Sequence, residues 1–342
     1  MSLEHCRLSR YPASNEVIDQ MLETITRHST NSQSSHLSLI GHLTHHRLQN
    51  SFQPVPQHRH VITFSNSSNT SDISTSIGFA YVDTKEESDT ATNTWFAPNT
   101  PPAFIRSSIH QLVKYCNALP DSPSNNVLFN YISHDYIPYI KDICTVSYEV
   151  LPHIGFIYRN TSANALDSLS HPIRARFTIQ NESYVIDTIR HSDISTILTN
   201  NKYEGYPTRE YVESCINCPI VGPLSRVIRV LPSIDAPVPK ELGELQPVSW
   251  CFVHIGFSIG LMWTMPEYRQ RGLGVVCVAS VTKALFEYME KESKNSGKVV
   301  APHCWTQQEN AGSIATFRKC GYGIVDGVAV DWIVGTLKEE FK

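Results

Sequence analysis

The residues best suited to carry chemistry lie in one short turn between an apolar stretch and a long amphipathic one. The turn reads Pro266-Glu267-Tyr268-Arg269-Gln270-Arg271-Gly272-Leu273-Gly274. Before it, Ser258 to Met265 is apolar enough for a buried strand. After it, apolar residues recur at helical spacing at Val275, Val278, Ala279, Thr282, Leu285, Phe286 and Met289. The pattern therefore predicts a strand, a glycine turn and a helix.

Such a turn is suited to binding a pyrophosphate. Glycine has no β-carbon, so the backbone at Gly272 and Gly274 can approach a ligand closely. The first-turn amides of the following helix and the positive end of its dipole favour an anion. An Arg-rich turn with two glycines can also be a tight connection only, so a second signal is needed.

The second signal lies downstream, after the strand-like run Val299 to Trp305. There, Asn310, Ser313, Phe317 and Gly321-Tyr322 fall at helical spacing. The predicted helix presents Asn310 and Ser313 near its start.

Together the two segments resemble the GNAT acyltransferase superfamily. The Arg-x-x-Gly-x-Gly turn is similar to its acyl-CoA pyrophosphate loop, and the segment that starts at Asn310 is similar to the helix that flanks the pantetheine arm. The resemblance narrows to the glycine N-acyltransferase-like family through Pro247-Val248-Ser249-Trp250 and, without a gap, Thr264 to Arg269. It covers residues 180–334 well and is faint over the first 170.

The resemblance implies an α/β protein with a C-terminal GNAT acyl-CoA N-acyltransferase fold, a mixed, splayed sheet flanked by helices. A degenerate GNAT-like α/β domain without a cofactor loop is expected to precede it. The expected domains are 1–165 and 175–342. The co-substrate is acyl-CoA, the acceptor is a small molecule such as glycine or another amino acid, and the family favours mitochondria, with the cytosol as the alternative. The residues expected at the cofactor are Met265, Arg269, Gln270, Arg271, Gly272, Leu273, Gly274, Asn310 and Ser313.

Acyl transfer to an amine needs a held donor, a hydrogen-bond donor for the oxyanion, and a group that takes a proton from the ammonium acceptor. The ungapped run places Ser258 where the family carries a glutamate thought to be the base. A serine hydroxyl does not ionise near neutral pH, so His254 and His303 are the substitute candidates, because an unperturbed imidazole titrates near 6.5. Phe317 stands where many superfamily members place a tyrosine acid, but a thiolate can leave without a proton partner.

Two other functions stay open. One is an acetyltransferase that acts on a protein or polyamine amine, which acidic grooves would favour. The other is a non-catalytic acyl-CoA binder, because Ser258 replaces the expected base.

Composition sets further limits. With a formal net charge of −4 and a pI near 6.4, the chain has no dense basic face for nucleic acid or an anionic membrane. The apolar stretches are interrupted or too short to span a bilayer.

Nine cysteines without a secretory signal predict free thiols, and Cys215-Ile-Asn-Cys218 reads as a helix end. A loose histidine cluster, with no acidic residue between its later members, is not expected to bind metal: His36, His42, His45, His46, His58 and His60.

The first half has an alternating α/β texture. Ser14 is expected to cap a helix with one apolar face, Val17 to Ile25. Thr90 to Pro102 and Ser65 to Ser76 read as surface loops. The other expected elements are strands at Leu37 to Leu43, His60 to Ser65, Ile77 to Val82 and Val127 to Ile132, and helices at Ile105 to Leu119 and Asp135 to Ile143.

In the second half, Ser183 to Ile189 is the expected opening strand. Two helices, Ser192 to Leu198 and Thr208 to Ile216, are expected to form the acceptor-side wall. Between Pro223 and Pro247 the chain carries about twenty residues more than the family pattern. This segment either extends a hairpin or reshapes the acceptor entrance.

Overall fold

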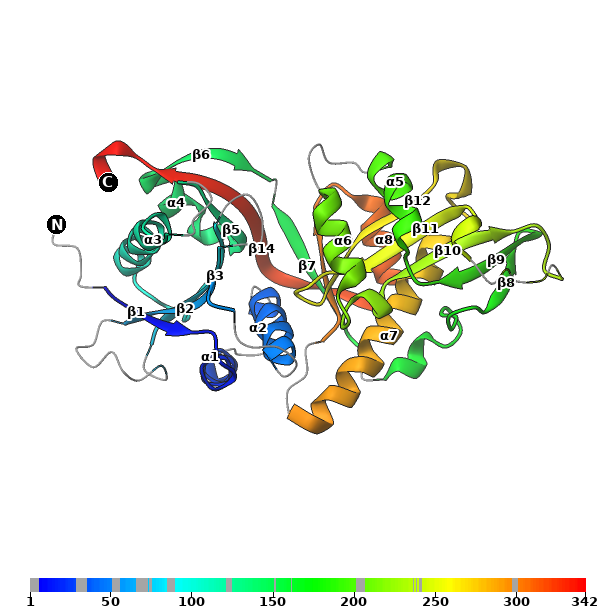
Figure 1. The fold of residues 1–342 in the computed structure, drawn as a ribbon, viewed down its shortest axis with the longest axis horizontal. Coiled ribbons are helices and arrows are strands. Elements are labelled where there is room, and N and C mark those ends of the chain that lie inside the picture. Colours follow the sequence, from blue (N-terminus) through cyan, green and yellow to red (C-terminus); the bar gives the residue numbers. More distant parts are fainter. Residues whose placement is uncertain are drawn as a thin grey trace. The chain divides into compact units, whose positions relative to one another are not determined.

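The computed structural model describes residues 6–28, 36–50, 56–65, 73, 76–84, 90–120, 125–150, 152–160, 162–200, 207–235, 237, 239, 242–296 and 301–342. The chain forms two compact units (Figure 1). Unit 1 consists of Met1–Gly155 and Val325–Lys342, and unit 2 of Phe156–Ile324.

Unit 1 is a mixed sheet with helices on both faces. Strands β1 to β4 pair antiparallel in order, and β4 pairs parallel with β5. Strand β14 (Tyr322–Leu337), near the end of the chain, pairs antiparallel with both β5 and β6. The elements are β1 (Arg7–Pro12), α1 (Asn15–His28), α2 (His36–Asn50), β2 (Arg59–Ser65), β3 (Gly78–Asp83), β4 (Thr90–Phe96), α3 (Pro102–Asn117), β5 (Val127–Ser133), α4 (Ile137–Ile143) and β6 (Cys144–Glu149).

Apolar side chains of alternate strand residues fill the two faces of this sheet, as the two-residue period of a strand requires. Phe79, Tyr81 and Trp95 pack with α1 and α2 in one core. Phe64 and Phe96 pack with α3 and α4 in the other.

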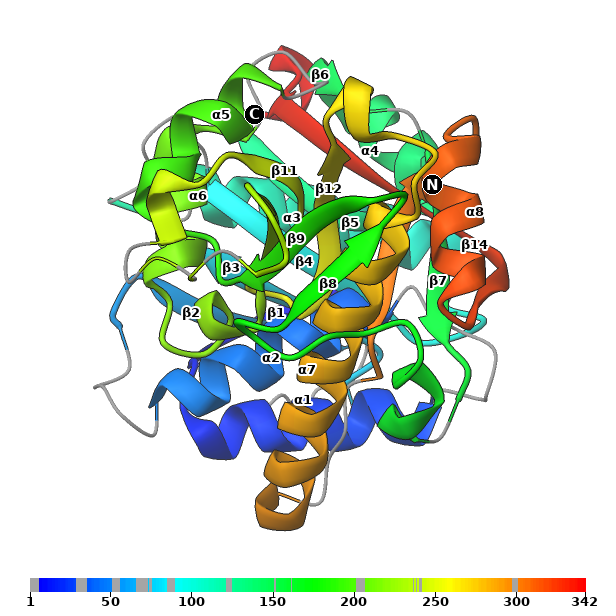
Figure 2. The same cartoon turned by 90° about the vertical axis from the view of Figure 1, so that its right-hand side faces the viewer.

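Unit 2 is also a mixed α/β structure. Strands β8 to β12 pair antiparallel in order, and β12 pairs parallel with β13, which neighbours β7. The elements are β7 (His153–Tyr158), β8 (Arg176–Ile179), β9 (Glu182–Asp187), α5 (Ile194–Thr199), α6 (Arg209–Asn217), β10 (Arg226–Leu231), β11 (Pro247–Val253), β12 (Ser258–Thr264), α7 (Leu273–Ser296), β13 (His303–Gln307), α8 (Ala311–Lys319) and β14 (Tyr322–Leu337). Helix α7 packs against β10, β11 and β12 (Figure 2).

One order of elements occurs twice along the chain. In unit 1 the order is β1-α1-α2-β2-β3-β4-α3-β5-α4-β6, and the chain from β9 to β14 repeats it as β9-α5-α6-β10-β11-β12-α7-β13-α8-β14. The connection that leads into the long helix differs. Residues 97–101 before α3 contain no glycine, whereas the connection before α7 is the glycine turn. The repeated order agrees with the expectation of a degenerate N-terminal domain of the same fold that lacks the cofactor loop.

The unit boundaries differ from the expected domains 1–165 and 175–342 at two points. The division after Gly155 falls before residues 165–175, where the boundary between the two domains is expected. The C-terminal part of β14 belongs to unit 1, because its backbone pairs with β5 from Val330 to Gly335 and with β6 from Ile333 to Leu337.

Most expected elements are confirmed, and two are wrong. The predicted strand Leu37 to Leu43 lies in helix α2, and the predicted loop at Thr90 begins with β4, in which all seven residues are buried. Ser14 caps α1 through a hydrogen bond from the Val17 amide to its hydroxyl oxygen. Of the predicted loop Ser65 to Ser76, residues 66–72 and 74–75 lie outside the described residues.

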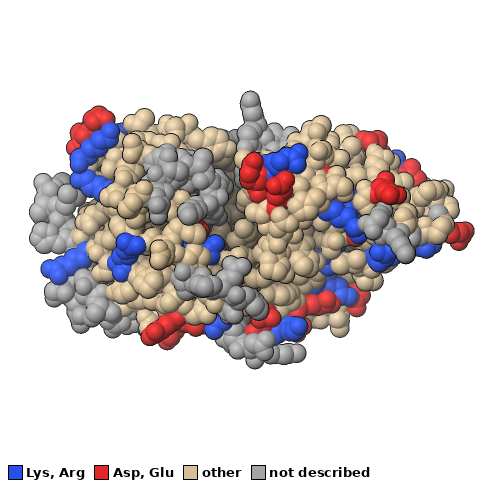
Figure 3. Space-filling view, viewed as in Figure 1, with Lys and Arg blue, Asp and Glu red and all other residues tan. Residues whose placement is uncertain are grey.

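The extra segment before Pro247 contains β10, which pairs antiparallel with β11, so a hairpin lies here as one of the two expectations has it. In the described part of the chain, no helix combines the length and the hydropathy needed to cross a membrane. Figure 3 shows basic and acidic side chains interspersed on the face that it presents.

Candidate acyl-CoA site

The site begins where two parallel strands of unit 2 diverge. Strands β12 and β13 pair at Ser258 with His303 and at Ile259 with Cys304. Beyond these pairs, β12 continues to Thr264 and β13 to Gln307. The predicted splayed sheet is therefore confirmed, and the opening lies at the carboxyl ends of the strands, where open α/β sheets bind ligands.

A β-bulge reshapes β12 beside this opening. Trp250 of β11 pairs with Trp263, and Phe252 pairs with Gly260, so the one residue between them on β11 faces two on β12, Leu261 and Met262. Leu261 has a φ of 45°, which is uncommon for a residue with a side chain. Because a bulge leaves its extra residue out of the ladder, it can turn a backbone amide away from β11.

The glycine turn connects β12 to the 24-residue helix α7. Its backbone takes left-handed conformations at Gln270 and Gly272, with φ values of 62° and 87°. A β-carbon on Gly272 would meet no atom within 4 Å, so the space beside this residue is open. The helix starts with the hydrogen bond from the Val276 amide to the Gly272 carbonyl, at 3.1 Å. The amides before Val276 therefore lack helical partners, as in an anion site at a helix start.

Both arginines of the turn contact the protein. Arg269 donates from Nε to the Thr264 carbonyl at 3.0 Å, and its guanidinium lies 4.7 Å from the Trp263 ring centre. Arg271 forms an ion pair with Glu182 at 2.5 Å. Hydrogen bonds from Tyr184 and Arg271 lower the pKa of the Glu182 carboxyl. These contacts tie the turn to β12 and to the start of β9.

The other residues expected at the cofactor lie around the same turn. Leu273 is buried, and Gly274 faces α8, since a β-carbon on it would lie 3.9 Å from Thr316. The Met265 amide donates to the Val248 carbonyl at 2.9 Å, so this amide serves the β11 ladder.

Asn310 and Ser313 stand at the start of α8. The Asn310 side-chain oxygen accepts a hydrogen bond from the Ser313 amide at 3.1 Å, so Asn310 is the N-cap of the helix. Because the side-chain oxygen makes the cap, the side-chain Nδ2 of Asn310 is a further hydrogen-bond donor at the start of the helix. The structure thus brings the turn and helix α8 together, since α7 packs against α8 and Gly274 faces Thr316.

The three candidates for the base also lie together. Ser258 pairs directly with His303 across the parallel ladder, and its carbonyl accepts from the His254 amide at 2.9 Å. All three residues are buried, with 2% of Ser258, 0% of His303 and 8% of His254 exposed. Neither the serine nor His303 is placed to contact a solvated amine directly.

Burial changes the acid–base chemistry of both histidines. It lowers the pKa of His254 to about 4, helped by the nearby His303. It also lowers the pKa of His303 to about 4, against the opposing effect of the Ala301 carbonyl, which accepts from its Nδ1 at 3.1 Å. The expectation of an imidazole that titrates near 6.5 is therefore wrong for both, because the interior disfavours their charged form.

The structure adds Tyr211 of α6, which the sequence analysis did not select. Its hydroxyl lies 2.5 Å from His254 Nδ1. The only sequence signal was the position of Tyr211 on a helix of the expected acceptor-side wall, because no spacing pattern connects it to a histidine 43 residues later.

The remaining aromatic candidates serve packing. Phe317 is buried, and its ring centre lies 5.2 Å from that of Tyr322 in an edge-to-face contact. The Tyr322 hydroxyl lies 2.8 Å from Thr282 Oγ1, and burial raises the pKa of Tyr322 well above its ordinary value. Phe317 has no ionisable group, and the buried hydroxyl of Tyr322 is engaged with Thr282.

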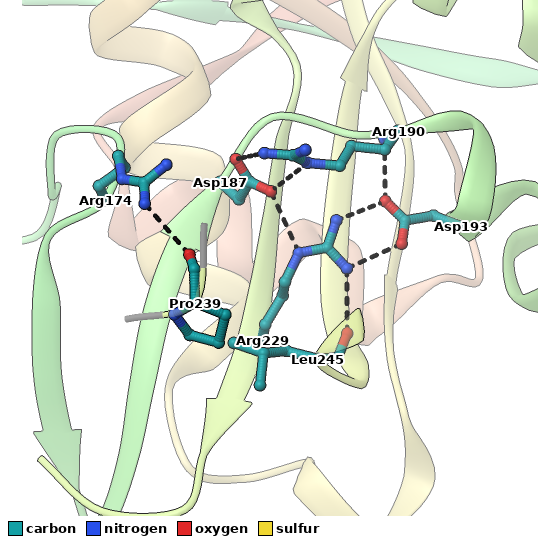
Figure 4. Close-up of polar contacts among 7 residues, drawn as sticks. All are labelled: Arg174, Asp187, Arg190, Asp193, Arg229, Pro239 and Leu245. Carbon is teal, nitrogen blue, oxygen red and sulfur yellow. Dashed lines mark hydrogen bonds and ion pairs between the residues drawn. The ribbon is translucent and has the colours of Figure 1, made fainter. Parts of the chain in front are cut away.

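A buried ion-pair network fixes the wall beside the site (Figure 4). Arg229 of β10 contacts Asp193, which precedes α5, and Asp187 at the end of β9. Arg190 contacts Asp187 from the outer side, and its backbone amide donates to Asp193. The network therefore joins two strands to the helix pair α5 and α6, which pack on one core.

Three histidines of the cluster, His42, His45 and His46, are buried in α2. His46 stacks on Tyr81 with ring centres 4.6 Å apart, and burial lowers the pKa of His45 to about 3. Among the residues that the structure describes, no group of three or more His, Cys, Asp or Glu side chains is arranged to hold a metal ion. All nine cysteines are buried and none of them forms a disulfide bond, and Cys218 follows the last residue of α6, so the predicted helix end is confirmed.

No family model matches the chain, and no curated protein matches it. Among solved structures, a Drosophila protein is similar with a TM-score of 0.65 and 13% identity, over 96% of this chain and 98% of that one. A GCN5-related N-acetyltransferase from Sphaerobacter thermophilus has a TM-score of 0.49 and 10% identity, over 98% and 95% of the two chains. A tandem GNAT protein from the clavulanic acid biosynthesis pathway has a TM-score of 0.49 and 11% identity, over 97% and 98%. The likeness to the Drosophila protein shows that a fold of this kind occurs in a solved structure.

Proposed function

We propose that unit 2 is an acyl-CoA-dependent N-acyltransferase of the GNAT type, related to the glycine N-acyltransferase-like family. One observation carries the proposal. The glycine turn at the start of α7 lies directly after β12, at the end where β12 diverges from β13. A pyrophosphate at the turn and an acyl arm between the strands would then belong to one extended ligand.

The turn has the properties that such a ligand needs. The open space at Gly272 lets a phosphate reach the backbone, and the helix start supplies amide donors. Gln270, Arg271 and the amides of Leu273 and Gly274 would surround the pyrophosphate. Asn310 and Ser313 would flank the arm, with Met265 and Arg269 on the β12 side.

The reaction would be acyl transfer to an amine. The amine attacks the thioester carbon, the carbonyl oxygen becomes an oxyanion, and coenzyme A leaves as a thiolate. The bulge at Leu261 and Met262 is the proposed source of the oxyanion's hydrogen bond, because its backbone departs from the β11 ladder.

The acceptor we propose is glycine or another small amino acid. The half-buried residues that pack beside β12 on the α5 and α6 side are apolar or aromatic: Leu198, Tyr211, Ile216, Ile255, Leu261, Trp263 and Met265. A polyamine or a basic protein segment would be better served by carboxylates at this wall. The carboxylates of α6 are Glu210, which is exposed, and Glu213, which pairs with Arg209, so the apolar surface is what supports a small acceptor.

A second candidate, an acyl-CoA binder without turnover, is favoured by one observation. Ser258 cannot act as a base, and both neighbouring histidines have a pKa of about 4. The turn would then retain its ligand while the chemistry was lost.

Two measurements on the full chain test these functions. Calorimetric titration measures the affinity for acetyl-, short-chain, benzoyl- and phenylacetyl-CoA. Thiol release, confirmed by product mass, measures turnover of the same donors with glycine and other amino acids. Turnover of any pair supports the transferase. Binding without release supports the binder, and no binding of any acyl-CoA contradicts both.

A further inference from the structure

We propose that Tyr211 is the catalytic residue that takes the proton from the acceptor amine, while it passes its own hydroxyl proton to His254. The inference rests on the proposed function and names the proton path that this function lacks. It assigns a role to a pair of residues from two separate elements, helix α6 and the turn between β11 and β12.

The contact between the two side chains is direct. Tyr211 Oη and His254 Nδ1 are 2.5 Å apart, and the ring centres are 5.8 Å apart with an interplanar angle of 35°. In the tautomer that carries its proton on Nε2, the imidazole accepts at Nδ1 and the tyrosine hydroxyl is the donor. The relay uses this tautomer, because a phenol oxygen can both donate its own proton and accept one from a second group.

A relay requires that the residue facing the amine is more exposed than the residue behind it, and the pair meets this requirement. His254 is 8% exposed and lies inside the unit, whereas Tyr211 is half-buried on α6. Of the pair, the tyrosine is therefore the member that an amine can contact from outside the unit.

The pair also lies next to the bulge in β12. A β-carbon on Gly260 would come within 2.4 Å of His254 Nε2, so the imidazole occupies the space that a side chain at Gly260 would fill. Gly260 is followed directly by Leu261, the first bulge residue, where we place the oxyanion's donor. The proton acceptor and the oxyanion donor would thus stand beside neighbouring residues of one strand.

The step balances without another reactant. The nitrogen of the amine forms a bond with the thioester carbon, and the pair of the carbon–sulfur bond leaves with sulfur. The N–H proton moves to Tyr211 Oη as the hydroxyl proton moves to His254 Nδ1. The proton then returns through the tyrosine to the thiolate or to solvent, which restores a neutral pair. The products are an amide and a thiol.

The decisive variant is Tyr211→Phe, which keeps the ring and removes only the hydroxyl. We expect kcat to fall about 100-fold or more, in the range of a positioned base, while KM and the acyl-CoA affinity stay within about twofold. Tyr288→Phe is the matched control. Tyr288 is a half-buried tyrosine on α7 whose ring centre lies 6.3 Å from that of Phe257, and its removal leaves the pair intact.

Gly260→Ala tests the same pair through His254 instead of Tyr211. Its methyl group must displace the His254 ring, so we expect a similar loss of kcat with the tyrosine unchanged. If the wild-type protein turns over and Tyr211→Phe keeps its kcat, the relay is wrong and the transferase stands. If Tyr211→Phe loses acyl-CoA affinity as well, the residue is structural and the relay is again wrong. A wild-type protein that binds acyl-CoA without turnover contradicts the relay and the transferase together.

Discussion

Arg229 and Asp193 form a two-point ion pair inside unit 2. Arg229 Nη1 lies 2.8 Å from one carboxylate oxygen of Asp193, and Nη2 lies 2.7 Å from the other. The side chains are 0% and 2% exposed. Two parallel hydrogen bonds between a guanidinium and a carboxylate fix the orientation of both side chains. The contact therefore holds the start of α5 against β10.

Arg229→Met should therefore be strongly destabilising. The variant removes the positive charge that faces the buried carboxylates of Asp187 and Asp193. Removing one partner of a buried ion pair costs about 3–5 kcal/mol. Arg190→Met is the control, because this arginine is 32% exposed and Asp187 keeps Arg229. We expect a cost of about 1 kcal/mol or less for the control. Urea denaturation measures both, and adding Asp187→Asn and Asp193→Asn to Arg229→Met should recover part of the loss. Equal costs for the two arginines would contradict this view of the network.

Gly274→Ala should move stability and ligand affinity in opposite directions. The new methyl group would lie 3.4 Å from Thr264 Oγ1, an ordinary contact, and alanine is the better helix former by up to about 1 kcal/mol. If the backbone here lies against a pyrophosphate, the same methyl group should weaken acyl-CoA binding by about tenfold or more. Denaturation and calorimetric titration measure the two effects. An affinity equal to that of the wild type would remove this residue from the proposed site.

The sequence predicted the glycine turn and the elements around it because their signals are local. A buried strand, two glycines and a helical period follow each other within Ser258 to Met289. Helix α2 was missed because Leu37 and Leu39 alternate with polar residues, which imitates a strand. Strand β4 was missed because its threonines and Asn93 are polar, although all seven of its residues are buried.

The base could not be predicted in the same way. The pKa of His254 depends on burial, which no pattern of residues along the chain specifies. Its contact with Tyr211 joins a helix to a turn 43 residues away. Contacts of this kind depend on how elements pack, and one sequence carries no signal for a single pair.

His303 makes stability depend on pH. Its pKa is about 4 in the folded protein and near 6.5 when unfolded, so between these values the unfolded chain binds a proton that the folded one does not. The free energy of unfolding should therefore fall as the pH falls from about 6.5 to 4, by up to roughly 3 kcal/mol for this group. His303→Gln keeps a donor for the Ala301 carbonyl and cannot titrate. Urea denaturation at pH 7, 5.5 and 4.5 should therefore show that the free energy of unfolding falls less steeply with pH in His303→Gln than in the wild type. The same slope in both proteins would show that His303 is not the titrating group.

Ser258→Glu distinguishes the relay from a base of the family type. The carboxylate would stand across the ladder from His303 and near His254, and a nearby negative charge raises the pKa of an imidazole. NMR titration of the assigned ring protons of His254 and His303 should then show a pKa above 4 for at least one of the two, and Ser258→Gln, which adds a similar volume without charge, should not. If Tyr211 passes its proton to His254, turnover of Ser258→Glu should be lost below the raised pKa, because a protonated imidazole cannot accept. If the glutamate acts on the amine directly, activity should instead extend to lower pH than in the wild type. We expect the loss, because Ser258 is 2% exposed and a side chain there reaches the histidines before it reaches solvent.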